Sequence, residues 1–416
     1  MPARTRDLRR RTRAPSGWRF PRMLRLLPAV LLQARRRAWP AAAAAVLTLG
    51  ATLTVLSPAT ALASQRATAQ GPDQAQFVSS GHAHPLAHGA PAPAFCRHGG
   101  PRLWAHLAAC GWPGPANTGP RLSHCPRHRL VPRGSSLGRA IVIRKANAVI
   151  SCQQIKGMLH IEARNVTVRN STIKSNSGAK GLAANGTAAI YVADGASAVI
   201  DHVTINGDHG VDACIWHQGF RLAVRAVNCH GADDGIFSWA DTSYSRATGD
   251  NFTIRDSYFH GFTHATSNGH EDGYQTEGAR NGLIAHNTYR MTAGADSAIA
   301  IWDSLKSSRD ITVTGNLITG GSFAVYAEDI SPGDGAQGSP SPLGGYSVTS
   351  IRFINNVFST FASGCVGKYG VWFTMAAWQP YRGGPTDGWH RYGNRVLETG
   401  ENIDARNPRH AGTRCG

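Results

Sequence analysis

A short alternation of apolar and polar residues recurs along the chain from Val166 onward. Each copy has an apolar-x-apolar unit and another apolar residue five positions later. Alternation with a period of two in β-branched residues predicts a strand, and a polar fifth position predicts a turn there, at Asn170, Asp256, Asn287 and Asn355. Seven copies align: VTVRNSTI from Val166, AVIDHVTI from Ala198, LAVRAVNC from Leu222, FTIRDSYF from Phe252, LIAHNTYR from Leu283, ITVTGNLI from Ile311 and IRFINNVF from Ile351.

These copies start 24 to 40 residues apart, a spacing typical of a solenoid. A second apolar run lies between them, as in ACIWHQG and SAIAIWD. Short strands repeated in this way predict an all-β fold, a right-handed parallel β-helix with capped ends, because parallel strands need crossovers and crossovers are right-handed. A β-propeller or a β-sandwich is the alternative. Both require antiparallel hairpins with Asn-Gly type turns at regular short spacing, and the sequence does not show that regular spacing.

Composition divides the chain into five parts. Arg35 to Arg37 precede an apolar run, and Ala61-Leu62-Ala63 has the small-x-small pattern of a signal peptidase site. Met23 is an alternative start, and an uncleaved anchor is an alternative fate of the apolar run. The predicted parts are a signal peptide (1–63), a disordered linker (64–95), a Cys-containing N-terminal cap (96–145), the β-helix (146–376) and a C-terminal cap or tail (377–416).

The net charge of +18 is a property of the N-terminal region. Residues 1–63 contain twelve arginines and one aspartate, whereas residues 146–416 contain 21 basic and 23 acidic side chains. A basic groove for nucleic acid is therefore not predicted. We expect a secreted, extracellular monomer that has no stable membrane association after signal cleavage.

Eight cysteines follow the signal segment, and an even number in an exported protein predicts disulfides. Cys214 and Cys229 lie on predicted neighbouring coils, and a bond between Cys365 and Cys415 would hold the tail, so we favour these two pairs. No C-x-x-C spacing occurs, which disfavours a zinc site. The sequence leaves the pairing order open for Cys96, Cys110, Cys125 and Cys152.

An acidic residue recurs just before the second apolar run. The copies read HGVDACIWHQ, HGADDGIFSWAD, NGHEDGYQTEG and GADSAIAIWD. On successive coils these side chains would stack on one wall, with strands about 4.8 Å apart. Such a row requires a cation, shared protons with raised pKa values, or a substrate. The alternative is that they are turn formers without a catalytic role. The acids are Asp212, Asp233, Asp234, Asp272 and Asp296.

Two segments resemble a known group of secreted bacterial β-helix proteins, the pectate-lyase-like superfamily. CGWPGPANTGP (110–120) is similar to the CGWPDxxNTGVP segment of that group, and HEDGYQTEG (270–278) is similar to its H-x-D-G-[IV]-Q strand. The resemblance covers the chain from about Cys110 to the C-terminus and implies the β-helix fold. It does not specify one activity, because members include lyases, glycoside hydrolases, epimerases and proteins without an assigned activity.

Polygalacturonase-type hydrolases of that superfamily carry an Asp, an Asp pair, a His and a basic pair in this order. The matching residues here are Asp212, Asp233 with Asp234, His270, and Lys306 with Arg309. The Asn-Thr-Asp, Gly-His-Gly and Arg-Ile-Lys forms are absent, which counts against galacturonan as the substrate. An inverting hydrolase needs two carboxyl groups about 6.5–9.5 Å apart, a separation that acids on stacked coils can provide.

A lyase would use different groups. Calcium, the one cofactor considered, would then neutralise the uronate, held by Asp212, Asp234, Asp272 and Glu277, and His270 or Lys306 would act as the base. Candidate catalytic residues are Asp212, Asp233, Asp234, His270, Asp272 and Lys306. Candidate substrate-binding residues are Trp239, Gln275, Glu277, Trp302 and Arg309, and a period of two places His270, Asp272 and Tyr274 on one side of their strand and Gln275 on the other.

The sequence thus predicts a secreted carbohydrate-active enzyme. It would cleave a polysaccharide in a groove beside the loop 241–250, by acid/base hydrolysis or by β-elimination. A non-catalytic β-helix that binds glycans or serves as a surface module is the alternative.

Overall fold

The computed structural model describes residues 92–134, 136–176, 187–238, 249–263, 269–303, 306–328, 348–373 and 389–404. The predicted signal peptide, nearly all of the linker, Trp239, most of the loop 241–250 and Cys415 lie outside these ranges. No helix within them is long and apolar enough to cross a membrane.

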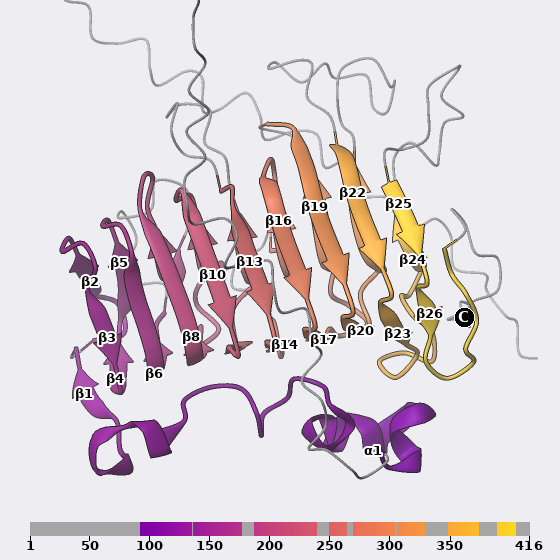
Figure 1. Ribbon diagram of the computed structural model, residues 1–416, viewed down its shortest axis with the longest axis horizontal. Helices are drawn as coiled ribbons and strands as arrows, with labels where there is room; N and C mark the ends of the chain where they lie inside the picture. The colour runs from indigo at the N-terminus through magenta and orange to yellow at the C-terminus, as the bar shows by residue number, and fades with distance from the viewer. Residues whose placement is uncertain are drawn as a thin grey trace, which may run out of the picture. The chain divides into compact units, whose positions relative to one another are not determined.

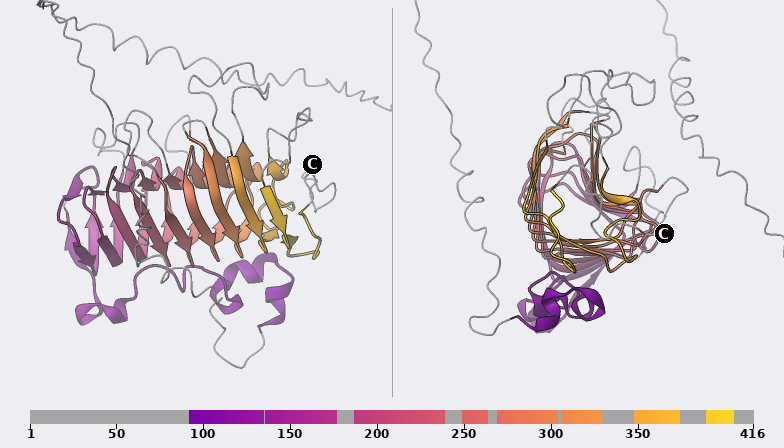
Figure 2. Two further views of the ribbon diagram at one scale, coloured as in Figure 1. Left: turned by 45° about the horizontal axis from the view of Figure 1, so that its top comes forward. Right: turned by 90° about the vertical axis from the view of Figure 1, so that its right-hand side faces the viewer.

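The chain folds as a parallel β-helix, which confirms the predicted all-β solenoid (Figure 1). Its strands form one nine-stranded sheet and one seventeen-stranded sheet, in which every strand pair is parallel. The larger sheet has two rows, because most coils contribute two short strands to it, and β6 and β8 run through both rows. Each coil passes from the nine-stranded sheet to the first row and then to the second row. Figure 2 shows these walls around a common interior.

The strands have the following bounds. The nine-stranded sheet contains β2 (Ala140–Ile143), β5 (Met158–Ile161), β7 (Ala188–Val192), β9 (Ala213–His217), β12 (Asp234–Ser238), β15 (Asp272–Thr276), β18 (Ser297–Trp302), β21 (Phe323–Glu328) and β24 (Gly370–Phe373). The first row contains β3 (Val149–Ser151), β6 (Val166–Lys174), β8 (Ser197–Asn206), β10 (Arg221–Arg225), β13 (Phe252–Arg255), β16 (Arg280–Ala285), β19 (Ser308–Thr314), β22 (Val348–Ile354) and β25 (Trp389–Tyr392). The second row contains β1 (Val131–Arg133), β4 (Gln153–Lys156), β11 (Asn228–His230), β14 (Tyr258–His260), β17 (Thr288–Arg290), β20 (Leu317–Thr319), β23 (Val357–Ser359) and β26 (Arg395–Val396). Parallel pairing therefore continues past the predicted boundary at residue 376.

The turn between the two rows has a left-handed residue at the fifth position of every copy. The φ angles there lie between 46° and 61°, a region that Asn, Asp and Gly enter at low cost. His and Ala also occupy this position, which composition did not predict. The seven residues are Asn170, His202, Ala226, Asp256, His286, Gly315 and Asn355.

The register corrects one of the seven aligned copies by one residue. Gly282, not Leu283, pairs with both Phe252 and Ile311. The ring of Phe252 occupies the place where a side chain of residue 282 would project, because a Cβ built there would lie 2.1 Å from Phe252 Cζ. With this register Tyr289 takes the last apolar position of the copy, and Asn287 moves from the turn into the sixth position.

Gly282→Ala is therefore expected to destabilise the fold by about 1–3 kcal/mol, the usual cost of overpacking a core. Phe252→Leu shortens the obstructing side chain. The double variant should be more stable than the sum of the two single losses predicts, which chemical denaturation would measure. Additive losses would contradict this account of the register.

The sixth position carries a ladder of buried asparagines in the later coils. The Asn287 backbone N–H donates to Asn316 Oδ1 at 2.8 Å, and Asn316 N–H donates to Asn356 Oδ1 at 3.1 Å. Asn394 continues the ladder, and its N–H donates to Asp404 Oδ1 at 2.9 Å. All four asparagine side chains are fully buried. The ladder thus satisfies backbone groups at a bend where strand pairing is interrupted.

The segment before the first strand follows the outer side of the second row (Figures 1 and 2). It contains η1 (Ala94–Arg97), α1 (Gly100–Ala105), η2 (Leu107–Cys110), η3 (Leu122–His124) and η4 (Pro126–His128). Trp104 stacks on Phe361 with ring centroids 5.3 Å apart, and Gly119 N–H donates to Ala226 O at 2.8 Å. The segment was predicted as an end cap. Its described part runs along the solenoid from the later coils to the first.

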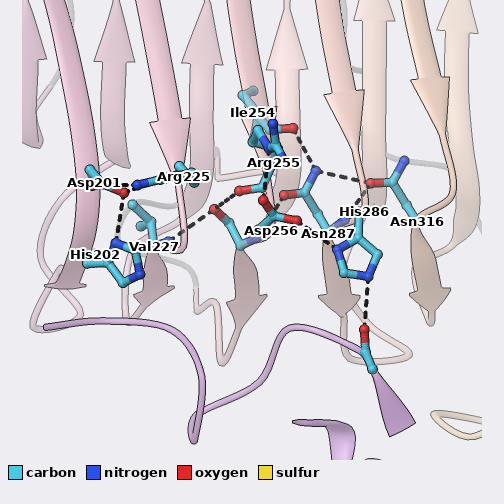
Figure 3. A network of polar contacts seen from close by, with 12 residues as sticks. Asp201, His202, Arg225, Val227, Ile254, Arg255, Asp256, His286, Asn287 and Asn316 are labelled. Atoms are coloured by element: carbon cyan, nitrogen blue, oxygen red, sulfur yellow. Dashed lines mark hydrogen bonds and ion pairs between the residues drawn. The ribbon is translucent and has the colours of Figure 1, made fainter. Parts of the chain in front are cut away.

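His286 fastens this segment midway. Its Nδ1 lies 2.8 Å from Asp256 Oδ1 (Figure 3). Its Nε2 lies 2.9 Å from the Gly111 carbonyl oxygen, and the ring stacks on Trp112. Through these two contacts the imidazole links Asp256, on the neighbouring coil, to the N-terminal segment. The pKa of Asp256 is lowered by the bond from His286 and by Arg255, against the effect of burial.

Three disulfides join described residues: Cys96–Cys110, Cys125–Cys152 and Cys214–Cys229. The last is one of the two pairs favoured from the sequence. The second bond ties the N-terminal segment to the first coil. Cys365 is also disulfide-bonded, and Cys415, its predicted partner, lies outside the described residues.

Candidate functional site

The acidic row (Asp212, Asp233, Asp234, Asp272 and Asp296) lies at the starting edge of the nine-stranded sheet, the edge where its parallel strands begin; the edge where they end is the finishing edge. Strands of this sheet place two consecutive residues in the solenoid core, as Ala298 and Ile299 do in β18 and Ala189 and Ile190 do in β7. The residue before such a pair therefore faces outward. Ala188 and Ala213 hold this position in β7 and β9 and belong to a separate outer apolar cluster.

Because two consecutive residues of each strand face the core, the strict period of two expected for the side chains of HEDGYQ is wrong. We call this pair of core-facing residues the double inward step. Gly273 and Tyr274 are both directed inward, since a Cβ at Gly273 would lie 2.4 Å from the Tyr289 ring and Tyr274 belongs to the core cluster. Asp272 and Gln275 consequently share the outer face, where a strict period of two had separated them. The carboxyl group and the amide can thus face one ligand.

Asp234 and Asp272 occupy equivalent positions on neighbouring strands. Asp234 pairs with Ala213, and Asp272 pairs with Ser297. Asp212 and Asp296 come one residue earlier in their coils, where backbone N–H groups bond to the preceding coil. Two of the five acids thus share one register, and the others flank them.

The two central carboxyl groups are buried, with Asp234 at 7% and Asp272 at 0% exposure. Asp234 Oδ1 accepts a hydrogen bond from the Asp272 N–H at 2.8 Å. Asp272 Oδ1 accepts one from the Ser297 hydroxyl at 2.5 Å. Within the described ranges Asp272 Oδ2 has no hydrogen-bond partner although it is buried. One acceptor of the pair is therefore left for a ligand or a proton.

The flanking acids differ in exposure. Asp233 is 3% exposed, and its carboxylate lies where a Cβ of Gly269 would project, within 2.0 Å, so residue 269 must lack a side chain. Asp212 is half-buried, and its Oδ2 accepts bonds from the Thr187 N–H at 2.5 Å and the Thr187 hydroxyl at 3.1 Å. Asp296 is also half-buried.

Both central carboxyl groups have pKa values well above the usual range. Burial raises the pKa of Asp234 most, and Asp233, Asp212 and Asp296 raise it further, against the bond from the Asp272 N–H. Burial also raises the pKa of Asp272 most, followed by the nearby charge of Asp234. Two such groups on adjacent strands cannot both ionise without a large cost. The pair therefore retains a proton at a pH where exposed carboxyl groups are ionised.

Because the pKa of Asp272 is raised in the native state, the free energy of unfolding depends on pH. The native state binds a proton that the unfolded state has released, so this contribution to stability is present at low pH and is lost as pH rises through the native pKa. Asp272→Asn removes this titration and keeps an acceptor for Ser297. We expect the variant to melt at a higher temperature than the wild type near neutral pH, with the difference shrinking as pH falls and absent below about pH 4. A difference that is constant with pH would contradict the assignment.

His270, two residues before Asp272, is in contact with the ring of Trp302. His270 precedes β15 and Trp302 ends β18, yet their rings meet edge to face with centroids 5.6 Å apart. Because these residues come from opposite edges of the sheet, their contact spans its outer face. Both are half-buried and so present part of their rings to solvent. In the described part of the chain Trp302 Nε1 has no hydrogen-bond partner.

The middle of the outer face carries a row of rings interrupted at one place. His160, Tyr191, Trp216 and Phe237 follow one another, with neighbouring centroids 4.8, 6.5 and 4.9 Å apart. Gln275 and Ala300 continue the row without rings. Tyr326 pairs with Ala300 and packs at 4.9 Å from Phe373. The interruption lies directly downstream of Asp272.

The basic candidates lie at the finishing edge. Lys306 Nζ is 3.1 Å from Asp250 Oδ2, and Asp250 Oδ1 accepts a bond from the Arg280 N–H at 2.9 Å. Arg309 has a 52% exposed side chain and lies 3.8 Å from Asp310. Glu277 is half-buried after β15. A five-residue strand spans more than about 13 Å, so these groups are apart from the acidic pair.

The starting edge thus brings together Asp212, Asp233, Asp234, Asp272 and His270, with Gln275 downstream of Asp272 on the same face. Lys306, Arg309 and Glu277 lie at the finishing edge with Trp302, whose ring is linked to the site by its contact with His270. In the described ranges, no group of three or more His, Cys, Asp or Glu side chains is arranged to hold a metal ion. Ser297, which donates a hydrogen bond to Asp272, was not predicted as a site residue. Its position in GADSAIAIWD, aligned with the acid of the other copies, was the available signal.

Comparison with known proteins adds no identification: no protein-family model matches the chain, and neither does any curated protein.

Proposed function

We propose that the protein is a carbohydrate-active enzyme that hydrolyses a polysaccharide on the outer face of the nine-stranded sheet. One observation carries the proposal: two carboxyl groups, Asp234 and Asp272, are buried on neighbouring strands and linked by a hydrogen bond from the Asp272 N–H, and this burial raises the pKa of both. A carboxylic acid that keeps its proton near neutral pH is what a glycosidase uses to protonate the leaving oxygen. Asp234 is the proposed general acid. An ionised carboxylate of the acidic row would act as the general base that activates the attacking water.

Hydrolysis is favoured over β-elimination because the site holds a carboxyl group with a raised pKa, while Lys306, one of the two candidate bases for elimination, lies away from it. Lys306 is ion-paired with Asp250 at the far edge, and Arg309 is exposed beside Asp310. Elimination would need a base next to a uronate carboxylate. His270 remains at the site, where it positions the ring of Trp302 against a bound sugar.

The pectate-lyase-like superfamily is the proposed family. The parallel β-helix supports it, as does the CGWPGPANTGP segment, whose Gly111 is bound by His286 and whose Gly119 bonds to Ala226. Secretion is proposed as well, on the support of three disulfides and the apolar segment near the N-terminus.

A panel of polysaccharides tests this proposal. Incubation with the purified protein is expected to release reducing ends without the ultraviolet absorbance of unsaturated products. Unsaturated products would instead identify a lyase. Binding without any cleavage would favour the non-catalytic alternative, to which the complete burial of Asp272 lends support.

A further inference from the structure

We infer that the site takes a polysaccharide of neutral sugars and discriminates against polyuronates. The inference rests on the proposed function only for the location of the site, and it concerns which sugar binds there. It follows from the charges at the starting edge and from the polar atoms left unpaired on the outer face.

Where β9, β12, β15 and β18 begin, the charge has one sign. Asp212, Asp233, Asp234, Asp272, Asp296 and Glu271 all lie there, and the described residues directly before these four strands (207–212, 231–233, 269–271 and 292–296) include no Lys or Arg, whereas Arg139 and Lys368 lie farther along the same edge, before β2 and β24. The described cations that could bind a uronate are directed elsewhere, since Lys306 pairs with Asp250 and Arg309 with Asp310. A sugar carboxylate would therefore meet like charges and find no counter-charge, which disfavours a polyuronate.

The same face has polar atoms suited to hydroxyl groups. Gln275 is 2% exposed and its Oε1 is unpartnered, Asp272 Oδ2 is unpartnered, and Trp302 Nε1 is an unpartnered donor, each among the described residues. Gln275 pairs with Ala300, two residues before Trp302, so it lies between the other two. Two acceptors and one donor in a line match hydroxyl groups, which both donate and accept.

The aromatic rings of Trp302 and His270 complete the proposed sugar-binding site. Trp302 and His270 present partly exposed rings where the outer aromatic row is interrupted at Gln275 and Ala300. An apolar ring face beside a few fixed polar groups is the usual composition of a small-molecule site. Buried polar atoms without partners cost stability, and a bound neutral sugar would supply the missing bonds.

Binding to the Asp234→Asn variant separates this inference from catalysis. Calorimetric titrations would use neutral gluco-, xylo- and galacto-oligosaccharides, oligogalacturonate, oligomannuronate and glucosamine oligomers. We expect at least one neutral oligosaccharide to bind about tenfold or more tightly than every charged one. Its affinity should not change with salt, whereas weak uronate binding should strengthen as salt screens repulsion.

Substitutions locate the binding. Gln275→Leu and Trp302→Phe each remove one polar atom and keep most of the side-chain volume, and each should weaken neutral-sugar binding by about threefold or more. Trp302→Ala should weaken it further. Tyr392→Ala is the matched control, because Tyr392 is an aromatic residue 73% exposed near the last described coil, and it should bind as well as the parent.

Tighter binding of a uronate or of glucosamine oligomers would overturn the inference, as would the absence of binding by every neutral oligosaccharide. Failure of the proposed function looks different: the wild type would bind a neutral oligosaccharide with the stated preference and leave it uncleaved.

Discussion

Asp234→Asn is expected to lower the rate of polysaccharide cleavage by about 10²-fold or more. Asp234 is the proposed proton donor because burial and three neighbouring acids raise its pKa, and an amide has no such proton to transfer. Asn keeps the oxygen that accepts the Asp272 N–H and removes a buried carboxyl group with a raised pKa, so the melting temperature should equal or exceed that of the wild type. Reducing-end assays and thermal denaturation of the same preparation measure both effects.

Asp310→Asn serves as the control for this substitution. Asp310 is 47% exposed in β19, outside the acidic row, and its left-handed backbone accepts Asn without strain. It should leave activity and stability near those of the wild type. If Asp234→Asn instead lost stability in proportion to activity, Asp234 would be a structural turn residue and the catalytic assignment would be wrong.

His270→Ala tests the same site from the aromatic side. Removing the imidazole frees the Trp302 ring that it contacts and opens the outer face. A loss of about 10²-fold in activity is expected, with little change in melting temperature. Unchanged turnover would exclude His270 from the site.

Asn316→Leu is expected to produce the largest loss of stability, about 3 kcal/mol or more. The Asn316 side chain accepts from the Asn287 N–H and side chain and donates to Ile284 O and Asn356 Oδ1, all of them buried. Leu has a similar volume and satisfies none of these groups. Chemical denaturation followed by circular dichroism would report the loss.

Asn281→Gly is the matched control. Asn281 is exposed, has φ of 58°, and makes one exposed bond to Asn251. Glycine adopts this backbone conformation freely, so stability should change by only a few tenths of a kcal/mol. Equal losses for the two variants would mean that the ladder contributes no more than a surface amide.

The sequence by itself determined the architecture. Alternation with a period of two in units such as VTVRNSTI and FTIRDSYF is a local signal, and its return at solenoid spacing leaves few folds that bury every apolar position. The Cys214–Cys229 pair followed from the same alignment. The recurrence of Asp before each second strand likewise predicted the acidic row, because equivalent positions on stacked coils become neighbours.

Only the tertiary structure decided the register and the membership of the site. Gly282 pairs with Phe252 because a ring from the neighbouring coil fills its place, a fact that no local pattern contains. The double inward step at Gly273 and Tyr274 brings Gln275 to the face of Asp272, and strand length keeps Lys306 with Asp250 at the other edge. The raised pKa values of Asp234 and Asp272 depend on burial, which coil packing sets and residue spacing does not.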